Sequence, residues 1–147
     1  MQANSEMRIQ PAVPGEVTVW MPVLFWGGAI FILSTEYFSA SNTGRLIEPI
    51  LWWLMPHASP LTISNLHFLI RKAAHFTEYG ILFWLLIRGP MAGRPYLALA
   101  ICALYACSDE AHQIFVPGRT ASLYDVGLDF GGALFSRFLH LAIIEIV

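Results

Sequence analysis

Residues 66–87 read LHFLIRKAAHFTEYGILFWLLI, and this stretch decides the class of fold. Its second part, from Gly80 to Ile87, is wholly apolar, whereas its first part includes Arg71, Lys72, His75 and Glu78. A helix of about 20 residues crosses a hydrocarbon core of roughly 30 Å, so the stretch predicts a membrane helix. Inserting an ionisable side chain at the centre of the membrane costs at least ~2.5 kcal/mol of free energy. The presence of such side chains here therefore points to a functional role.

The composition of the whole chain also favours a membrane protein. Of its 147 residues, 56% are hydrophobic and only 12% are charged, whereas soluble domains carry about 25% charged residues. The mean hydropathy is +0.59 and the formal net charge is −2. This balance excludes a basic nucleic-acid binder, so no nucleic-acid partner is expected, and it excludes an acidic disordered tail.

Three further apolar segments are long enough to cross a bilayer. They cover residues 17–35, 96–115 and 122–146. The first could instead be a signal peptide, but residues 1–16, which we expect to form a disordered lead-in, lack the net positive charge of such a peptide. Together with residues 66–87, these segments predict an all-α integral membrane bundle of about four transmembrane helices within residues 17–147.

The segment between the first two spans is interrupted by prolines. Pro49, Pro56 and Pro60 occur too often for a spanning helix. Trp52 and Trp53 favour the membrane–water interface, so we expect a short interfacial helix over residues 46–55. A loop that covers the bundle is the alternative.

The polar residues of the last three spans are expected to converge. They lie at the start of residues 66–87, at the end of 96–115 and at the start of 122–146, and these ends share one membrane side in an up-and-down bundle. On the last helix, Asp125 and Asp129 share a face that Gly132 and Ser136 continue. The GxxxG pair Gly127 and Gly131 favours a close helix crossing, and Ser122 suits a helix cap.

These residues also carry a family resemblance. Arg71-Lys-Ala-Ala-His75-Phe-Thr-Glu-Tyr79-Gly-Ile-Leu82 resembles the K-x-x-H-F-x-E-Y-x-x-L block of the VanZ-like membrane protein family. Asp109-Glu110-Ala-His-Gln113-Ile-Phe115-Val-Pro-Gly-Arg119-Thr-Ala-Ser122-Leu-Tyr-Asp125 is similar to its D-E-x-x-Q-x-F-x-P-G-R-x-x-S-x-x-D block. The blocks cover about the last 80 residues, and Asp129 departs from the family's common Asn.

The resemblance implies an envelope-associated, multi-pass protein of the bacterial inner (cytoplasmic) membrane. The family is named after a protein linked to resistance to teicoplanin, a glycopeptide antibiotic, so a link to such resistance is implied here too. No settled catalytic mechanism comes with the family. Once the cations of the motif are set aside, the remaining arginines favour a cytoplasmic N-terminus, which places the polar residues on the outer side.

We hypothesise that the polar cluster acts on or binds a membrane lipid or a lipid-linked envelope precursor. Candidates for acid–base catalysis are His75, Glu78, Asp109 and Glu110. Candidates for substrate binding are Arg71, Lys72, Tyr79, Gln113, Arg119, Ser122, Asp125 and Asp129. The alternatives are a non-catalytic binding or accessory protein and a purely structural ion-pair network. A transporter is disfavoured, because the other half of the bundle is apolar.

No cofactor is expected from the sequence. A divalent metal ion is the one alternative, since the two helices offer enough ligands for it. These are His75, Glu78, Asp109, Glu110 and His112. Their spacing does not match a zinc signature such as HExxH.

Overall fold

The protein is described by a computed structural model that covers residues 16–146, in which all regular structure is helical. The elements are α1 (Glu16–Leu33), the 3-10 helix η1 (Glu36–Phe38), α2 (Ala40–Leu54), α3 (Pro60–Arg88), α4 (Pro95–Gln113) and α5 (Leu123–Ile146). The prediction of an all-α fold is confirmed. Residues 1–15 of the predicted lead-in lie outside the described part of the chain, and Glu16 is already the first residue of α1.

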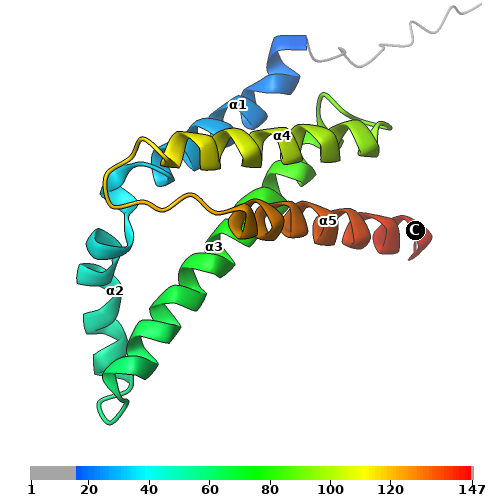
Figure 1. The fold of residues 1–147 in the computed structure, drawn as a ribbon. Helices are drawn as coiled ribbons and strands as arrows, with labels where there is room; N and C mark the ends of the chain where they lie inside the picture. The colour runs from blue at the N-terminus through cyan, green and yellow to red at the C-terminus, as the bar shows by residue number, and fades with distance from the viewer. Residues whose placement is uncertain (1–15, 147) are drawn as a thin grey trace, which may run out of the picture.

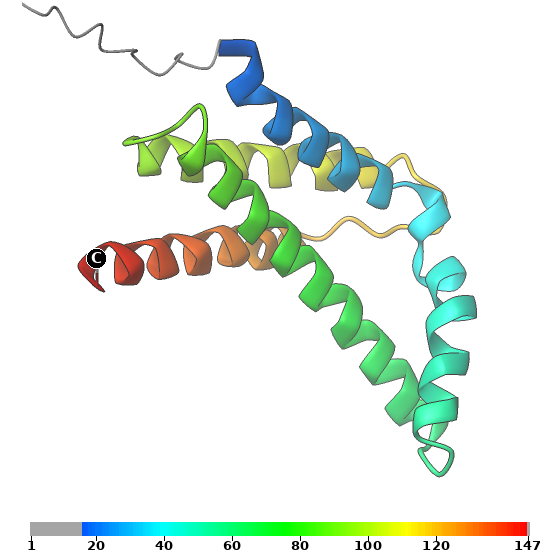
Figure 2. The ribbon, with the colours of Figure 1, turned by 180° about the vertical axis from the view of Figure 1, so that it is seen from behind.

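α1, α4, α5 and the second half of α3 lie together as a group, and α2 and the first half of α3 extend away from it. α3 runs diagonally across α1, α4 and α5 (Figure 1), and it contacts all three. The first half of α3 leaves this group and meets α2 through the turn at residues 55–59, so that α2 and α3 form a V (Figure 2). The loop at residues 114–122, between α4 and α5, runs across the open side of this V.

α3 begins earlier than the sequence pattern predicts, because Ser59 and Pro60 make a good helix start. The Ser59 side chain accepts a hydrogen bond from the Thr62 N–H at 3.2 Å. Proline suits the first helical position, since no partner is needed there for its missing N–H. The helix therefore has 29 residues and is roughly 43 Å long, and the polar motif lies near its middle. α2 is also longer than the expected interfacial helix, with Pro49 inside it.

α3 and α5 cross in direct backbone contact at Gly132. A Cβ atom at this position would lie 1.9 Å from the Phe76 carbonyl oxygen and 2.8 Å from its carbon, so no side chain fits. Gly80 lies across from it, where an added Cβ would be 3.3 Å from the Gly132 oxygen. The expectation of a close crossing on this helix is thus met at Gly132. The GxxxG pair does not form the contact, because Gly127 faces open space.

The core of the group contains apolar side chains of α3 packed on small residues of α4. Tyr79, Phe83 and Leu86 of α3 are fully buried, and they pack in one cluster with Cys102 and Ala106. Small residues at an interface let helix backbones approach closely. The large side chains of this cluster thus come mainly from α3.

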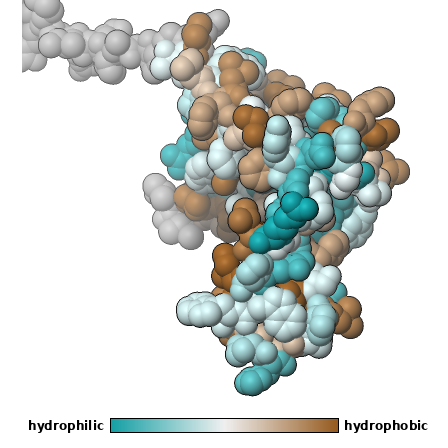
Figure 3. Space-filling view, turned by 90° about the vertical axis from the view of Figure 1, so that its left-hand side faces the viewer, coloured by the Kyte–Doolittle hydropathy of each residue, from teal (hydrophilic) through white to brown (hydrophobic). Residues whose placement is uncertain are grey.

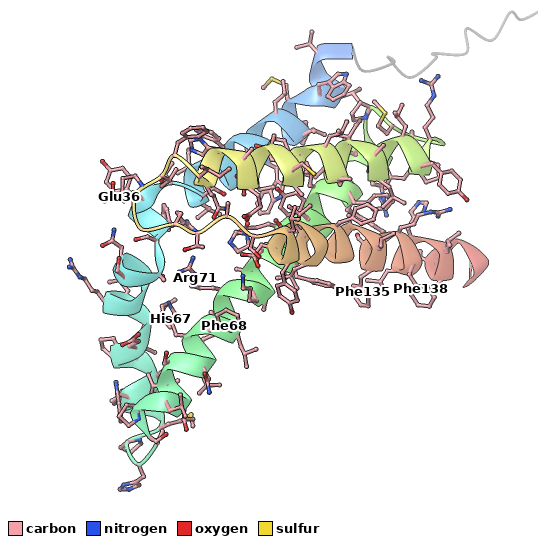
Figure 4. The ribbon with its side chains drawn as sticks, in the orientation of Figure 1. Glu36, His67, Phe68, Arg71, Phe135 and Phe138 are labelled. Carbon is pink, nitrogen blue, oxygen red and sulfur yellow. The ribbon has the colours of Figure 1, made fainter. Side chains whose placement is uncertain are left out.

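Many large apolar side chains point outward instead. Phe25 on α1, Leu104 on α4 and Phe138 on α5 are 79%, 72% and 66% exposed. Figure 4 shows Phe135 and Phe138 pointing away from α5 on the side opposite α4. The protein therefore presents apolar rings and aliphatic chains on its outer surface.

One described helix is both long and apolar enough to cross a membrane, namely Leu123–Ile143 within α5. The helices Val17–Leu33 and Glu36–Leu54 would qualify together as one span, although they are bent by 68° at their junction. The predicted spans in α3 and α4 include the charged residues of the motif, which lower their hydropathy. The prediction of four transmembrane helices is therefore not confirmed by length and composition.

Arg119 ties the loop at residues 114–122 to the end of α1. Its Nη2 atom donates hydrogen bonds to the carbonyl oxygens of Leu33, Thr35 and Phe38. The last carbonyl groups of a helix lack partners within the helix. One guanidinium thus caps α1 and fixes the link that leads into α2.

We expect Gly132→Ala to destabilise the protein by at least 1–3 kcal/mol, because the added methyl group must push α5 away from the Phe76 backbone. Unfolding of the purified protein in detergent, followed by circular dichroism, measures this. Gly127→Ala is the matched control on the same helix and should be neutral or stabilise by up to about 1 kcal/mol. Equal stability of the two variants would contradict a crossing at Gly132.

We expect Arg119→Ala to lower the free energy of unfolding by about 2 kcal/mol, since three carbonyl groups lose a charged donor. The loop at residues 114–122 should also become more sensitive to protease. Arg94→Ala, in the exposed turn between α3 and α4, should change stability by less than about 0.5 kcal/mol. An Arg119→Ala variant as stable and as resistant as this control would refute the capping role.

Candidate functional site

Three helices bring four of the candidate catalytic and binding residues together. α3 contributes His75 and Glu78, α4 contributes Asp109 and α5 contributes Asp129. His75 Nδ1 lies 3.7 Å from Asp129 Oδ1 and 3.8 Å from Glu78 Oε2. One ligand atom from each of His75, Asp109 and Asp129 lies within 4.8 Å of the other two. We call these four residues the buried cluster.

The helix crossing places this cluster. His75 directly precedes Phe76, whose carbonyl faces Gly132, and Asp129 lies three residues before Gly132 on α5. Because residues three apart share a helix face, Asp129 must point toward α3 near His75. The shared face of Asp129, Gly132 and Ser136 that the sequence predicts is buried in the structure, with Asp129 at 0% exposure.

Asp109 is held by two hydrogen bonds to one of its oxygens. Ser34 Oγ donates to Oδ2 at 2.7 Å, and Gln113 Nε2 donates to the same atom at 3.2 Å. Ser34 was missed by sequence reasoning. It follows the end of α1, 75 positions earlier in the chain, and a serine after an apolar run carries no signal of such a contact.

Glu110 joins α4 to the start of α5. Its Oε1 accepts a hydrogen bond from Gln113 Nε2 at 3.0 Å, and its Oε2 accepts one from the Ser122 N–H at 2.8 Å. Ser122 in turn caps α5, since its Oγ accepts from the Tyr124 N–H at 3.1 Å. The expected cap is thus present. Glu110 and Ser122 are thus engaged with each other, and Gln113 links Glu110 to Asp109 of the buried cluster.

Lys72 and Asp125 form an ion pair beside the cluster. Both side chains are about one-fifth exposed, at 20% and 19%. The pair links the middle of α3 to the first turn of α5. Asp125 also lies where a negative charge is favoured by the helix dipole.

A polar cavity of about 330 Å³ lies inside the V. Arg71, Lys72 and Arg119 line it together with His75 and Asp125. Figure 4 shows Arg71 and His67 pointing into the angle between α2 and α3. Seen from the side of α2, hydrophilic residues gather in the middle of the molecule, with hydrophobic ones to either side (Figure 3). Among the described residues, Arg71 forms no ion pair.

Two further hollows are lined in part by α3. A hollow of about 140 Å³ is lined by Arg71, His75, Glu78 and Arg119, so it touches the buried cluster. An apolar hollow of about 370 Å³ follows the contact of α3 and α5 past Gly80. Burial lowers the pKa of the Arg119 guanidinium, and nearby Arg71 lowers it further, but arginine stays charged in proteins.

Several buried polar atoms of the site have no hydrogen-bond partner within residues 16–146. They are His75 Nδ1, Glu78 Oε2, Tyr79 Oη, Arg119 Nε and both carboxylate oxygens of Asp129. Buried polar groups in native proteins nearly always have partners, so each exception calls for an explanation. His112, which the metal alternative included, lies instead against the ring of Phe31 at 4.6 Å between ring centres.

The comparisons with known proteins agree with the two sequence motifs. The sequence model of the VanZ/LLP1 family matches residues 19–144, which is nearly the whole described chain. Neither a curated protein nor a solved structure matches this sequence. The match includes most of α1 and all of α2, which lie outside the two motifs. The chain belongs to the VanZ/LLP1 family.

Proposed function

We propose that this protein is a multi-pass protein of the bacterial inner membrane that binds an anionic lipid or lipid-linked envelope precursor. The observation that carries the proposal is the polar cavity inside the V, where Arg71 forms no ion pair with any acid of the described residues. The residues of the buried cluster stand next to this cavity.

Insertion in a membrane is supported by the outer surface. Only 22% of the apolar stretch in α5 is buried, whereas the core helix of a soluble protein would be mostly buried. The outward rings and aliphatic chains on α1, α4 and α5 suit lipid contact. We therefore propose that α1, α3, α4 and α5 cross the membrane, with the N-terminus in the cytoplasm and the motif toward the outer side.

Binding of an anionic headgroup is supported by the charge of the polar cavity. Arg71 can meet a phosphate or carboxylate with two parallel hydrogen bonds, which few other side chains can do. Lys72 is paired with Asp125, and Arg119 donates to backbone carbonyls. Among the cations that line the cavity, Arg71 is thus the one whose N–H groups are most available to bind a ligand. The separate apolar hollow along α3 and α5 would take an acyl chain.

Catalysis is a second candidate, favoured by His75 and Glu78. His75 lines the cavity, and its ring nitrogen lies 3.8 Å from the Glu78 carboxylate. A histidine beside a carboxylate is a common acid–base pair. A protein that only binds its lipid would use the same cavity without needing proton transfer by Glu78.

We expect Arg71→Gln to lower the amount of co-purified anionic phospholipid by about 10-fold or more, because a charged hydrogen-bond pair contributes about 1.5–3 kcal/mol. Native mass spectrometry of the full chain in detergent measures this.

Arg94→Gln is the control, since Arg94 is exposed in the turn between α3 and α4, away from the cavity. It should bind as much lipid as the wild type. An equal loss in both variants would mean that lipids bind by surface charge alone, and no loss at Arg71→Gln would refute the proposal.

We expect Glu78→Gln to retain bound lipid, since the amide keeps the size of the side chain and the cations of the cavity are unchanged. Teicoplanin susceptibility of cells with equal amounts of wild-type or variant protein tests for turnover. Loss of a phenotype with lipid still bound would identify proton transfer at Glu78, which accounts for about 10²–10⁴-fold in rate. If Glu78→Gln keeps both the phenotype and the bound lipid, the protein is a non-catalytic binder. Loss of bound lipid in Glu78→Gln would contradict the expectation.

A further inference from the structure

We propose that His75, Asp109 and Asp129 bind a divalent transition-metal ion, for which Zn²⁺ is the favoured metal. The three residues come from α3, α4 and α5, so the ion would join all three helices at their crossing. The proposed function does not require an ion, and ion binding can be measured without any lipid.

The spacing of the ligand atoms fits an ion better than direct hydrogen bonds. His75 Nδ1 and Asp129 Oδ1 are 3.7 Å apart, which exceeds a hydrogen-bond distance. Two ligands bound to one ion at about 2.1 Å are roughly 3–4 Å apart. The widest separation in the set is 4.8 Å or less, so small side-chain movements close it around an ion.

Asp129 is the strongest single indication of a ligand. Its side chain is 0% exposed, and neither carboxylate oxygen accepts a hydrogen bond from a described residue. His75 Nδ1, which lies 3.7 Å from Asp129 Oδ1, likewise has no hydrogen-bond partner within residues 16–146. A buried carboxylate without hydrogen bonds or a paired charge is strongly disfavoured. A bound cation would satisfy both residues at once.

No described cation of the protein fills this role. Lys72 pairs with Asp125, and Arg119 uses Nη2 for the end of α1. Arg71 lines the cavity without an ion pair to any described acid. Three carboxylates, those of Glu78, Asp109 and Asp129, share the site with one imidazole, and the Arg119 guanidinium lines the adjoining 140 Å³ hollow.

The ligand types point to a transition metal. Imidazole suits Zn²⁺, Cu²⁺, Fe²⁺ and Ni²⁺, whereas Mg²⁺ prefers oxygen ligands in an octahedron. One histidine and two carboxylates match an open zinc site in the number of protein ligands, which is three, and in the ligand types that zinc accepts. Ser34 and Gln113 orient Asp109 through Oδ2, as outer residues do around metal ligands. They leave Oδ1 of Asp109 without a hydrogen bond among the described residues.

An ion could reach the site from the polar cavity. His75 lines both the 330 Å³ cavity and the 140 Å³ hollow beside it. Glu78 lines the smaller hollow, and its unpartnered Oε2 lies near His75. The open coordination position would therefore face the side where a ligand enters.

Zn²⁺ titration of the full chain in detergent, after removal of metal with a chelator, tests the proposal. We expect one tightly bound Zn²⁺ per chain by equilibrium dialysis and elemental analysis, and a rise in the unfolding temperature with Zn²⁺. Mg²⁺ at the same concentration should not compete. Asp129→Asn and His75→Ala should each weaken Zn²⁺ binding by about 10–100-fold or more, since even outer-residue changes have effects of this size.

His57→Ala serves as the control, because His57 is exposed in the turn between α2 and α3 and should leave binding unchanged. Without metal, Asp129→Asn should be at least as stable as the wild type, because it removes an unpaired buried carboxylate. A destabilised metal-free Asp129→Asn would instead mean a structural ion pair with His75 and would overturn the proposal. So would a wild type that binds no Zn²⁺, or an Asp129→Asn variant that binds it equally.

Discussion

The contact between the backbones of α3 and α5 at Gly132 is the constraint on which the site depends. With the Phe76 carbonyl where a Cβ of residue 132 would be, the two helices can cross only if that residue is glycine. The crossing point then sets the height and rotation of α5 against α3, and with them the meeting of His75 and Asp129. A shift of one residue would rotate Asp129 by about 100° and remove it from the site.

Around this crossing, the polar residues divide into two roles. Glu110, Ser122 and Arg119 are engaged in joining helix ends, with bonds to backbone groups that would otherwise lack partners. His75 and Asp129 have buried atoms without such partners. The scaffold residues named here belong to the second sequence motif, whereas His75 belongs to the first and Asp129 follows the second. Glu110, Ser122 and Arg119 fix the helix ends, and the fixed helices in turn hold His75 and Asp129 in place. This support explains how a small chain can keep ionisable side chains buried.

Much of the helical framework could be predicted from the sequence, and less of the site. Runs of about 20 apolar residues and the turn residues between them locate α1, α4 and α5 closely. The start of α3 is not located by the pattern, because a proline such as Pro60 can either interrupt a helix or occupy its first position. The convergence of the polar ends of the last three helices could be predicted, because successive helices of an up-and-down bundle run in opposite directions. The contacts of Ser34 and Arg119 could not be predicted, because their partners are 75 to 86 residues away in the chain.

By itself, the sequence determined the all-α class, the family and the helix face on which each polar residue lies, because helical periodicity is a local property. The tertiary structure alone decided which faces meet. It paired Lys72 with Asp125, turned His112 toward Phe31 and brought Asp129 to His75. The crossing point and rotation of two helices depend on how their side chains pack. That packing involves residues far apart in the chain, so no local pattern contains it.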